Sequence, residues 1–134
     1  MVLGGGIAGL SAAVKAGRMG ARVLLLERYP FIGGMATAGM VSPFMRYSTN
    51  EHVLVRGIFD DLQDIMKNEQ GMLENGFRAD IFRFAARTLL ENAGVEVWTQ
   101  AELIGVTKNS RMIESLQVLH GNHLKEVKGK YFID

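Results

Sequence analysis

A glycine-rich turn near the start of the chain constrains its fold more than any other feature. Gly4, Gly6 and Gly9 have the spacing G-x-G-x-x-G, and Glu27 follows the apolar run Leu24–Leu26. Such a turn, between a strand and a helix and with an acid about 20 residues later, is typical of proteins that bind a dinucleotide. The sequence therefore predicts a strand, a turn, a helix and a second strand, with a nucleotide at the turn.

Each residue of the turn has a separate physical task. Gly4 lets the chain turn sharply, Gly6 lets the backbone approach a pyrophosphate, and Gly9 lets the helix pack on the strand. We expect the helix to begin near Ile7, so that the free N–H groups around Ile7 and Ala8 point at the phosphates. These five residues are candidate cofactor-binding residues.

Glu27 is the candidate ribose-binding residue. Its carboxylate can accept hydrogen bonds from both ribose hydroxyls and would repel a 2′-phosphate. The turn and Glu27 do not distinguish NAD from FAD, because both cofactors contain an ADP half.

The composition excludes several classes of protein. The chain has 134 residues, 48% of them hydrophobic, and a net charge of +1. Its Lys and Arg residues are scattered, so we expect no nucleic-acid partner. No apolar run reaches the roughly 18 residues of a membrane span, so we expect no membrane partner. The chain has no cysteine, which excludes disulfides and thiolate metal sites and agrees with a cytoplasmic location.

The periodicity predicts an α/β fold, in which a Rossmann-like parallel sheet is followed by an antiparallel three-stranded meander. Amphipathic spacing indicates helices, short apolar runs indicate buried strands, and Asn109-Ser110 and Gly121-Asn122 are turn-forming pairs. A polar connection is expected over 68–76. The predicted strands are 1–3, 22–26, 95–98, 101–108, 112–119 and 124–133, and the predicted helices are 7–19, 57–67 and 79–92.

A long connection over 28–47 separates the second strand from the next helix. It contains Gly33 and Gly34 and is rich in Met, Phe, Ile and Val, so we expect it to be ordered. Long irregular loops of compact domains are usually functional.

Three segments resemble the N-terminal third of FAD-dependent oxidoreductases of the glutathione-reductase-like flavoprotein superfamily. The segments are 4–13, 25–28 and 32–37. The resemblance implies FAD as the cofactor, with the Gly33-Gly34 pair lying against its pyrophosphate and ribityl chain. The expected cofactor-binding residues are Gly4, Gly6, Ile7, Ala8, Gly9, Glu27, Arg28, Gly33, Gly34, Met35, Ala36 and Thr37.

The resemblance also implies the domain organisation and the function. Residues 1–134 would form one partial FAD-binding domain, incomplete at both ends, with 95–134 as its strand and meander portion. The whole oxidoreductase would pass a hydride or an electron pair from a small-molecule substrate to FAD. Two alternatives stay open: an NAD-dependent or other ADP-binding protein, and a truncated, non-catalytic fragment. Without the C-terminal FAD contacts of the family, the chain would bind FAD weakly, and unpaired strand edges would lead it to associate with a second copy.

No residue is assigned a catalytic role, and no metal site is expected. His52 could face a substrate, but a surface position is the simpler interpretation. His120 and His123 flank a turn without a third ligand nearby. The acids Asp60, Asp61 and Asp64 lie on the polar face of a predicted helix, which explains them sufficiently.

Overall fold

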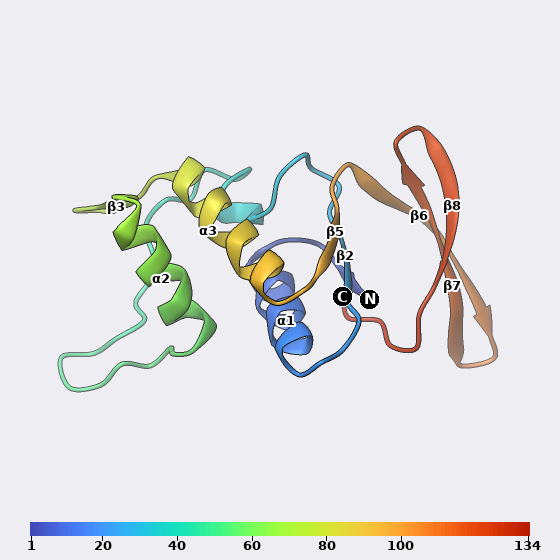
Figure 1. The fold of residues 1–134 in the computed structure, drawn as a ribbon, viewed down its shortest axis with the longest axis horizontal. Coiled ribbons are helices and arrows are strands. Elements are labelled where there is room, and N and C mark those ends of the chain that lie inside the picture. The colour runs from blue at the N-terminus through green and yellow to red at the C-terminus, as the bar shows by residue number, and fades with distance from the viewer.

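The computed structural model describes all 134 residues and places a parallel sheet between a helical layer and an antiparallel meander (Figure 1). The predicted fold class is confirmed. The elements are β1 (Val2–Leu3), α1 (Ile7–Arg18), β2 (Leu24–Leu26), the 3-10 helix η1 (Gly34–Ala36), α2 (Ile58–Asn68), β3 (Met72–Leu73), β4 (Gly76–Phe77), α3 (Ala79–Asn92), β5 (Glu96–Trp98), β6 (Ala101–Asn109), β7 (Met112–His120) and β8 (His123–Lys128).

The parallel sheet has the strand order β1-β2-β5, and its two faces pack against different layers. Successive side chains of a strand point to opposite faces. Val2, Leu25 and Val97 contribute to the cluster that also contains the buried faces of the helices. On the opposite face, Leu26 packs with Leu116 and other residues of the meander. The alternation within three very short strands thus separates two hydrophobic clusters.

The end of the chain does not continue the meander. The strand predicted over 124–133 ends at Lys128, and Ile133 forms a parallel bridge with Val2. The Leu3 N–H donates to the Ile133 carbonyl at 2.8 Å, and the Ile133 N–H donates to the Met1 carbonyl at 3.0 Å. The backbone N–H and C=O groups on the free edge of β1 need hydrogen-bond partners, and Ile133 provides these partners. The prediction for this segment was therefore wrong beyond Lys128.

The helices α1 and α3 pack on the parallel sheet, and α2 packs against these two helices. The helix α3 buries the residues that its periodicity predicted, namely Phe82, Ala85, Ala86, Leu89 and Leu90. An ion pair of 2.6 Å between Arg18 and Asp61 joins α1 to α2. None of the helices combines the length and the apolar character that crossing a membrane requires.

The connection predicted as polar over 68–76 contains a small hairpin, which corrects that prediction. The strands β3 and β4 pair antiparallel, and Phe77 of β4 is buried. The Ser42 hydroxyl accepts the Phe77 N–H at 3.2 Å and donates to the Phe77 carbonyl at 3.1 Å. The ring of Phe44 lies 4.5 Å from that of Phe77 and 5.0 Å from that of Phe59. These contacts attach the long loop after η1 to the helical layer.

Replacing Leu116 by alanine tests whether the meander is held by the smaller cluster. Leu116 is 1% exposed, so Leu116→Ala should lower the free energy of unfolding by about 2–5 kcal/mol. Leu124 on the adjacent strand is 63% exposed, so Leu124→Ala should change it by less than about 0.5 kcal/mol. Urea denaturation measures both, and equal losses would contradict the assigned faces of the meander.

Candidate functional site

The glycine turn joins β1 to α1 in a conformation that only glycines permit. Gly4 has φ +89°, a region that residues with a side chain rarely adopt. A Cβ on Gly9 would overlap the carbonyl oxygen of Gly4, whereas a Cβ on Gly6 would meet no atom within 4 Å. The three glycines therefore differ: Gly4 and Gly9 are needed by the fold, and Gly6 borders open space.

The first turn of α1 presents unpaired donors to that open space. Gly6 caps the helix without a side-chain hydrogen bond, and the first turn contains no acidic residue. The N–H groups of Ile7, Ala8 and Gly9 donate to no group of the chain. Free N–H groups and the positive end of the helix dipole together form an anion site. The geometry at Gly6 thus fits a pyrophosphate, whose oxygens would accept these donors.

Glu27 lies at the end of β2 and is held inside the site. Its Oε2 accepts the Gly5 N–H at 2.6 Å, and its Oε1 accepts the Tyr29 N–H at 2.8 Å. The side chain is only 6% exposed. Sequence reasoning assigned Glu27 to a ribose and missed these internal bonds. Each carboxylate oxygen has a further lone pair, so the internal role leaves acceptor capacity for a hydroxyl.

The Gly33-Gly34 pair packs directly on the glycine turn. The Gly33 N–H donates to the Gly5 carbonyl at 2.8 Å. A Cβ on Gly34 would lie 2.9 Å from the Cα of Gly6, and both Gly33 and Gly34 have positive φ. Two glycine segments that are distant in the sequence therefore form one surface, as the expected cofactor site requires.

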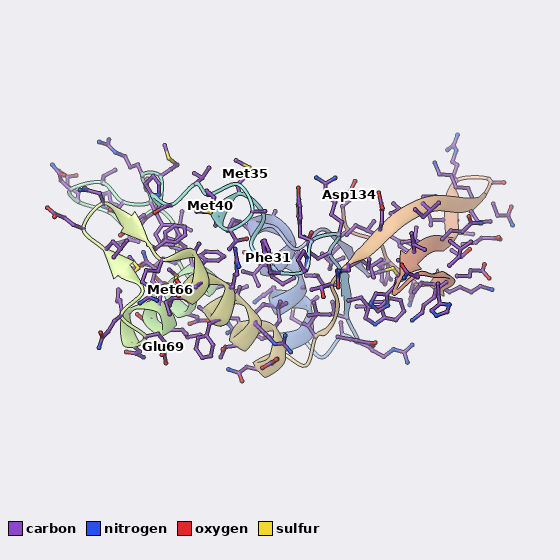
Figure 2. The ribbon with its side chains drawn as sticks, turned by 90° about the horizontal axis from the view of Figure 1, so that it is seen from above. Phe31, Met35, Met40, Met66, Glu69 and Asp134 are labelled. Atoms are coloured by element: carbon purple, nitrogen blue, oxygen red, sulfur yellow. The ribbon has the colours of Figure 1, made fainter.

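The three residues after this pair differ in accessibility. Met35 is 65% exposed, whereas Ala36 and Thr37 are buried. The Thr37 hydroxyl donates to the Ile32 carbonyl at 3.0 Å, so it stabilises the loop from within. Figure 2 shows Met35 and Met40 along the same stretch of this loop. The side chains that the loop offers to a ligand are thus methionines rather than Thr37.

A polar hollow of about 410 Å³ lies beside Arg28, on the side of the meander. It lies beyond the carboxyl ends of β2 and β5, where open α/β sheets bind their ligands. Arg28 lines the hollow. Its guanidinium carbon also lies 5.0 Å from the centre of the neighbouring Tyr29 ring. The lining residues are Arg28, Pro30, Thr99, Gln100, Glu102, Leu119, His120, Gly121 and Asn122.

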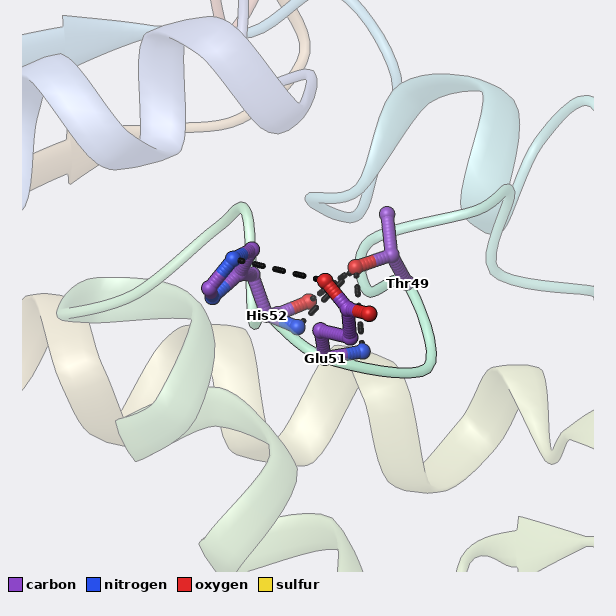
Figure 3. A network of polar contacts seen from close by, with 3 residues as sticks. All are labelled: Thr49, Glu51 and His52. Atoms are coloured by element: carbon purple, nitrogen blue, oxygen red, sulfur yellow. Dashed lines mark hydrogen bonds and ion pairs between the residues drawn. The ribbon is translucent and has the colours of Figure 1, made fainter.

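His52 lies at the tip of a small hairpin. The bridge between Ser48 and Val53 closes the hairpin, and Thr49 organises its tip (Figure 3). The Thr49 hydroxyl accepts the His52 N–H at 2.9 Å and the Glu51 N–H at 3.3 Å. The His52 side chain is 77% exposed, which favours the surface interpretation.

The other polar candidates have local explanations. Asp60 accepts the Gly57 N–H at 2.9 Å and caps α2, and Asp64 pairs with Lys67 at 3.5 Å. At the start of α3, the hydrogen bond from the Arg78 guanidinium holds the pKa of Asp80 below its ordinary value. No group of three His, Asp or Glu residues is close enough to hold a metal ion.

Sequence reasoning missed one side-chain cluster beside the polar hollow. The His120 ring stacks on Trp98 at 4.7 Å, and the Lys125 amine lies 4.5 Å from the centre of the Trp98 ring. The only signal in the sequence was the position of His120 before the predicted turn. Its partner Trp98 comes from β5 in a different sheet, so the stacking depends on how the sheets pack.

Comparison with known proteins gives one family and several relatives. The family model described as FAD dependent oxidoreductase matches residues 1–134. A digeranylgeranylglycerophospholipid reductase from Thermoplasma volcanium is 28% identical over 99% of this chain, and one from Thermoplasma acidophilum is 25% identical over the same share. The chain spans 37% of the length of these curated relatives.

Solved structures share the fold. A geranylgeranyl bacteriochlorophyll reductase-like protein from Thermoplasma acidophilum superposes with a TM-score of 0.66 at 23% identity, over 98% of this chain and 37% of that one. An aklavinone-11 hydroxylase, solved with FAD and aklavinone, gives a TM-score of 0.56 at 15% identity, over 98% of this chain and 31% of that one. At these identities the likeness concerns the fold.

Glu27→Gln tests the internal role of the carboxylate without any ligand. The amide has only one acceptor oxygen for the N–H groups of Gly5 and Tyr29. Its N–H₂ group would face whichever of these two donors the oxygen does not bind. The free energy of unfolding should fall by about 1–3 kcal/mol in urea denaturation. Glu114→Gln, at an exposed position of β7, should leave it within about 0.5 kcal/mol. A Glu27→Gln variant as stable as the original would contradict the internal role.

Proposed function

The chain belongs to the FAD-dependent oxidoreductase family, and we propose that its glycine turn and Gly33-Gly34 loop together hold the ADP half of FAD. The observation that carries this proposal is the packing of Gly34 on Gly6 beside the unpaired N–H groups of α1. The space at Gly6 is open and is bordered by unpaired donors, which is what a pyrophosphate needs.

FAD is the cofactor of this family, which confirms the prediction from the sequence. FAD supplies the two-electron redox chemistry, and the protein binds, orients and electrostatically tunes it. The residues of this chain contribute to the binding and the orientation. The N–H groups of Ile7, Ala8 and Gly9 would neutralise phosphate charge.

The adenosine would extend from the turn along the end of β2. Glu27 keeps one lone pair on each carboxylate oxygen beyond its bonds to Gly5 and Tyr29, and these would accept the ribose hydroxyls. The adenine would then enter the polar hollow beside Arg28. The same carboxylate would thus position both the protein backbone and the cofactor.

The isoalloxazine would lie beyond Gly34, over the 37–45 segment. Met40 and Met45 on this segment are exposed, and Met is flexible enough to pack against a flat ring. The anchor between Ser42 and Phe77 keeps the segment in place. We propose that this segment forms one wall of the flavin site.

The whole protein would be a reductase that transfers an electron pair between FAD and a small organic molecule. The curated relatives are named as reductases of a phospholipid, which supports a reduction rather than a hydroxylation. Because the chain spans 37% of those relatives, the substrate-binding groups are not assigned to residues of this chain.

Gly6→Ala separates cofactor binding from folding. The space around Gly6 is open and its φ is −70°, so alanine should change the free energy of unfolding by less than about 1 kcal/mol. Its methyl group would occupy the position of the pyrophosphate, so we expect the affinity for FAD to fall at least about tenfold, which corresponds to about 1.4 kcal/mol. Quenching of flavin fluorescence on titration measures the affinity.

Gly129→Ala is the matched control. A Cβ at Gly129 would make ordinary contacts, with its nearest atoms at 3.4 Å, and Gly129 lies outside the glycine turn. It should leave the affinity for FAD unchanged. If Gly6→Ala binds FAD as well as the original chain does, the proposed pyrophosphate position is wrong.

We also propose that the chain associates with a second copy through β6. This strand has a neighbour on one side only, and it exposes Leu103, Ile104 and Val106. Sedimentation velocity should show a concentration-dependent dimer, and Ile104→Lys should return it to monomer. The control Met19→Lys, at an exposed position outside the meander, should leave the dimer unchanged. A monomer at all concentrations would contradict this proposal.

A further inference from the structure

A second hollow, of about 390 Å³, lies beside α3. Its volume falls within the range of small-molecule sites. Ile32, Leu90 and Val95 form a buried apolar floor, and the rings of Phe31 and Phe84 stand at its walls. No glycine of the turn lines it, so it is separate from the site proposed for the pyrophosphate.

Arg83 lacks a hydrogen-bond partner inside this hollow. Its guanidinium carbon lies 3.7 Å from the centre of the Phe31 ring, which holds the group flat on the aromatic face. Its Nε is buried and donates to no atom. An unsatisfied buried donor is costly, and more so on a charged group, so an acceptor that paired with this guanidinium from the hollow would offset part of that cost.

The charges around the hollow leave Arg83 uncompensated. Arg87 also lines the hollow, but its Nε donates to Glu91 at 2.7 Å, and the two charges offset each other. Arg83 forms no ion pair. The hollow therefore combines one free cation with an apolar floor and aromatic walls.

We propose that this hollow binds a flat aromatic carboxylate. The carboxylate would accept hydrogen bonds from the Arg83 guanidinium, which presents a planar fork of donors suited to that group. The aromatic ring would lie on the apolar floor between Phe31 and Phe84. Phe31 projects from the loop after β2 at the middle of the molecule (Figure 2).

The test uses 2-naphthoate as the probe and the chain saturated with FAD. Backbone amide shifts in a ¹H–¹⁵N spectrum locate the binding and follow its saturation. We expect changes centred on Ile32, Arg83 and Val97, with a dissociation constant on the order of 1 mM, as for a fragment-sized ligand. Neutral 2-naphthamide should bind at least about tenfold more weakly, because it cannot pair with the guanidinium charge.

Three variants distinguish a site from adventitious binding. Arg83→Met keeps the packing and removes the charge, so it should lose the preference for naphthoate over naphthamide. Arg83→Lys keeps a charge without the planar fork and should recover part of the affinity. Arg111→Met, at an exposed position of the meander, should bind as the original does.

The flavin absorbance of each variant shows that the fold and the FAD site are intact, so a failure here is distinguishable from a failure of the proposed FAD site. The proposal is overturned if naphthoate causes no saturable shifts around Arg83, if naphthamide binds equally well, or if Arg83→Met retains the preference while still holding FAD.

Discussion

The backbone of Gly5 is the junction on which the rest of the site depends. Its N–H donates to Glu27 at the end of β2, and its carbonyl accepts the Gly33 N–H of the following loop. A Cβ at Gly5 would come within 2.7 Å of the Ile32 side chain and 3.0 Å of Glu27, so a larger residue here would push these two side chains away. The pattern G-x-G-x-x-G allows any residue at position 5, yet in this chain the backbone of Gly5 connects three segments.

The two-sided packing of the parallel sheet explains why so small a sheet can support this junction. Helices cover one face and the meander covers the other, so strands of two and three residues are buried as in a larger sheet (Figure 1). The carboxyl ends of β2 and β5 stay open between these layers. Both hollows begin there and share Pro30 and Thr99 in their linings.

The sequence was sufficient for features that local patterns encode and insufficient for those that depend on tertiary packing. The glycine turn, α1 and α3 follow from glycine spacing and helical periodicity. A family resemblance placed the Gly33-Gly34 pair against the cofactor, but only the structure shows that Gly34 packs on Gly6. The pairing of Ile133 with Val2 was not predictable, because apolar alternation does not reveal which strand is the partner. The stacking of His120 on Trp98 and the bonds of Ser42 to Phe77 likewise join distant segments.

Because side chains alternate in β2, the pairing register of this strand decides whether the nucleotide site forms. A shift of this strand by one residue would exchange its two faces, bringing Leu24 and Leu26 to the helices and Leu25 to the meander. The same shift would carry Glu27 about 3.3 Å along the strand axis and out of reach of the Gly5 N–H. Misregistered molecules would thus lose the nucleotide site together with their packing. Retention of the flavin would then select the correctly paired molecules during folding, because ligand binding stabilises only the state that contains the site.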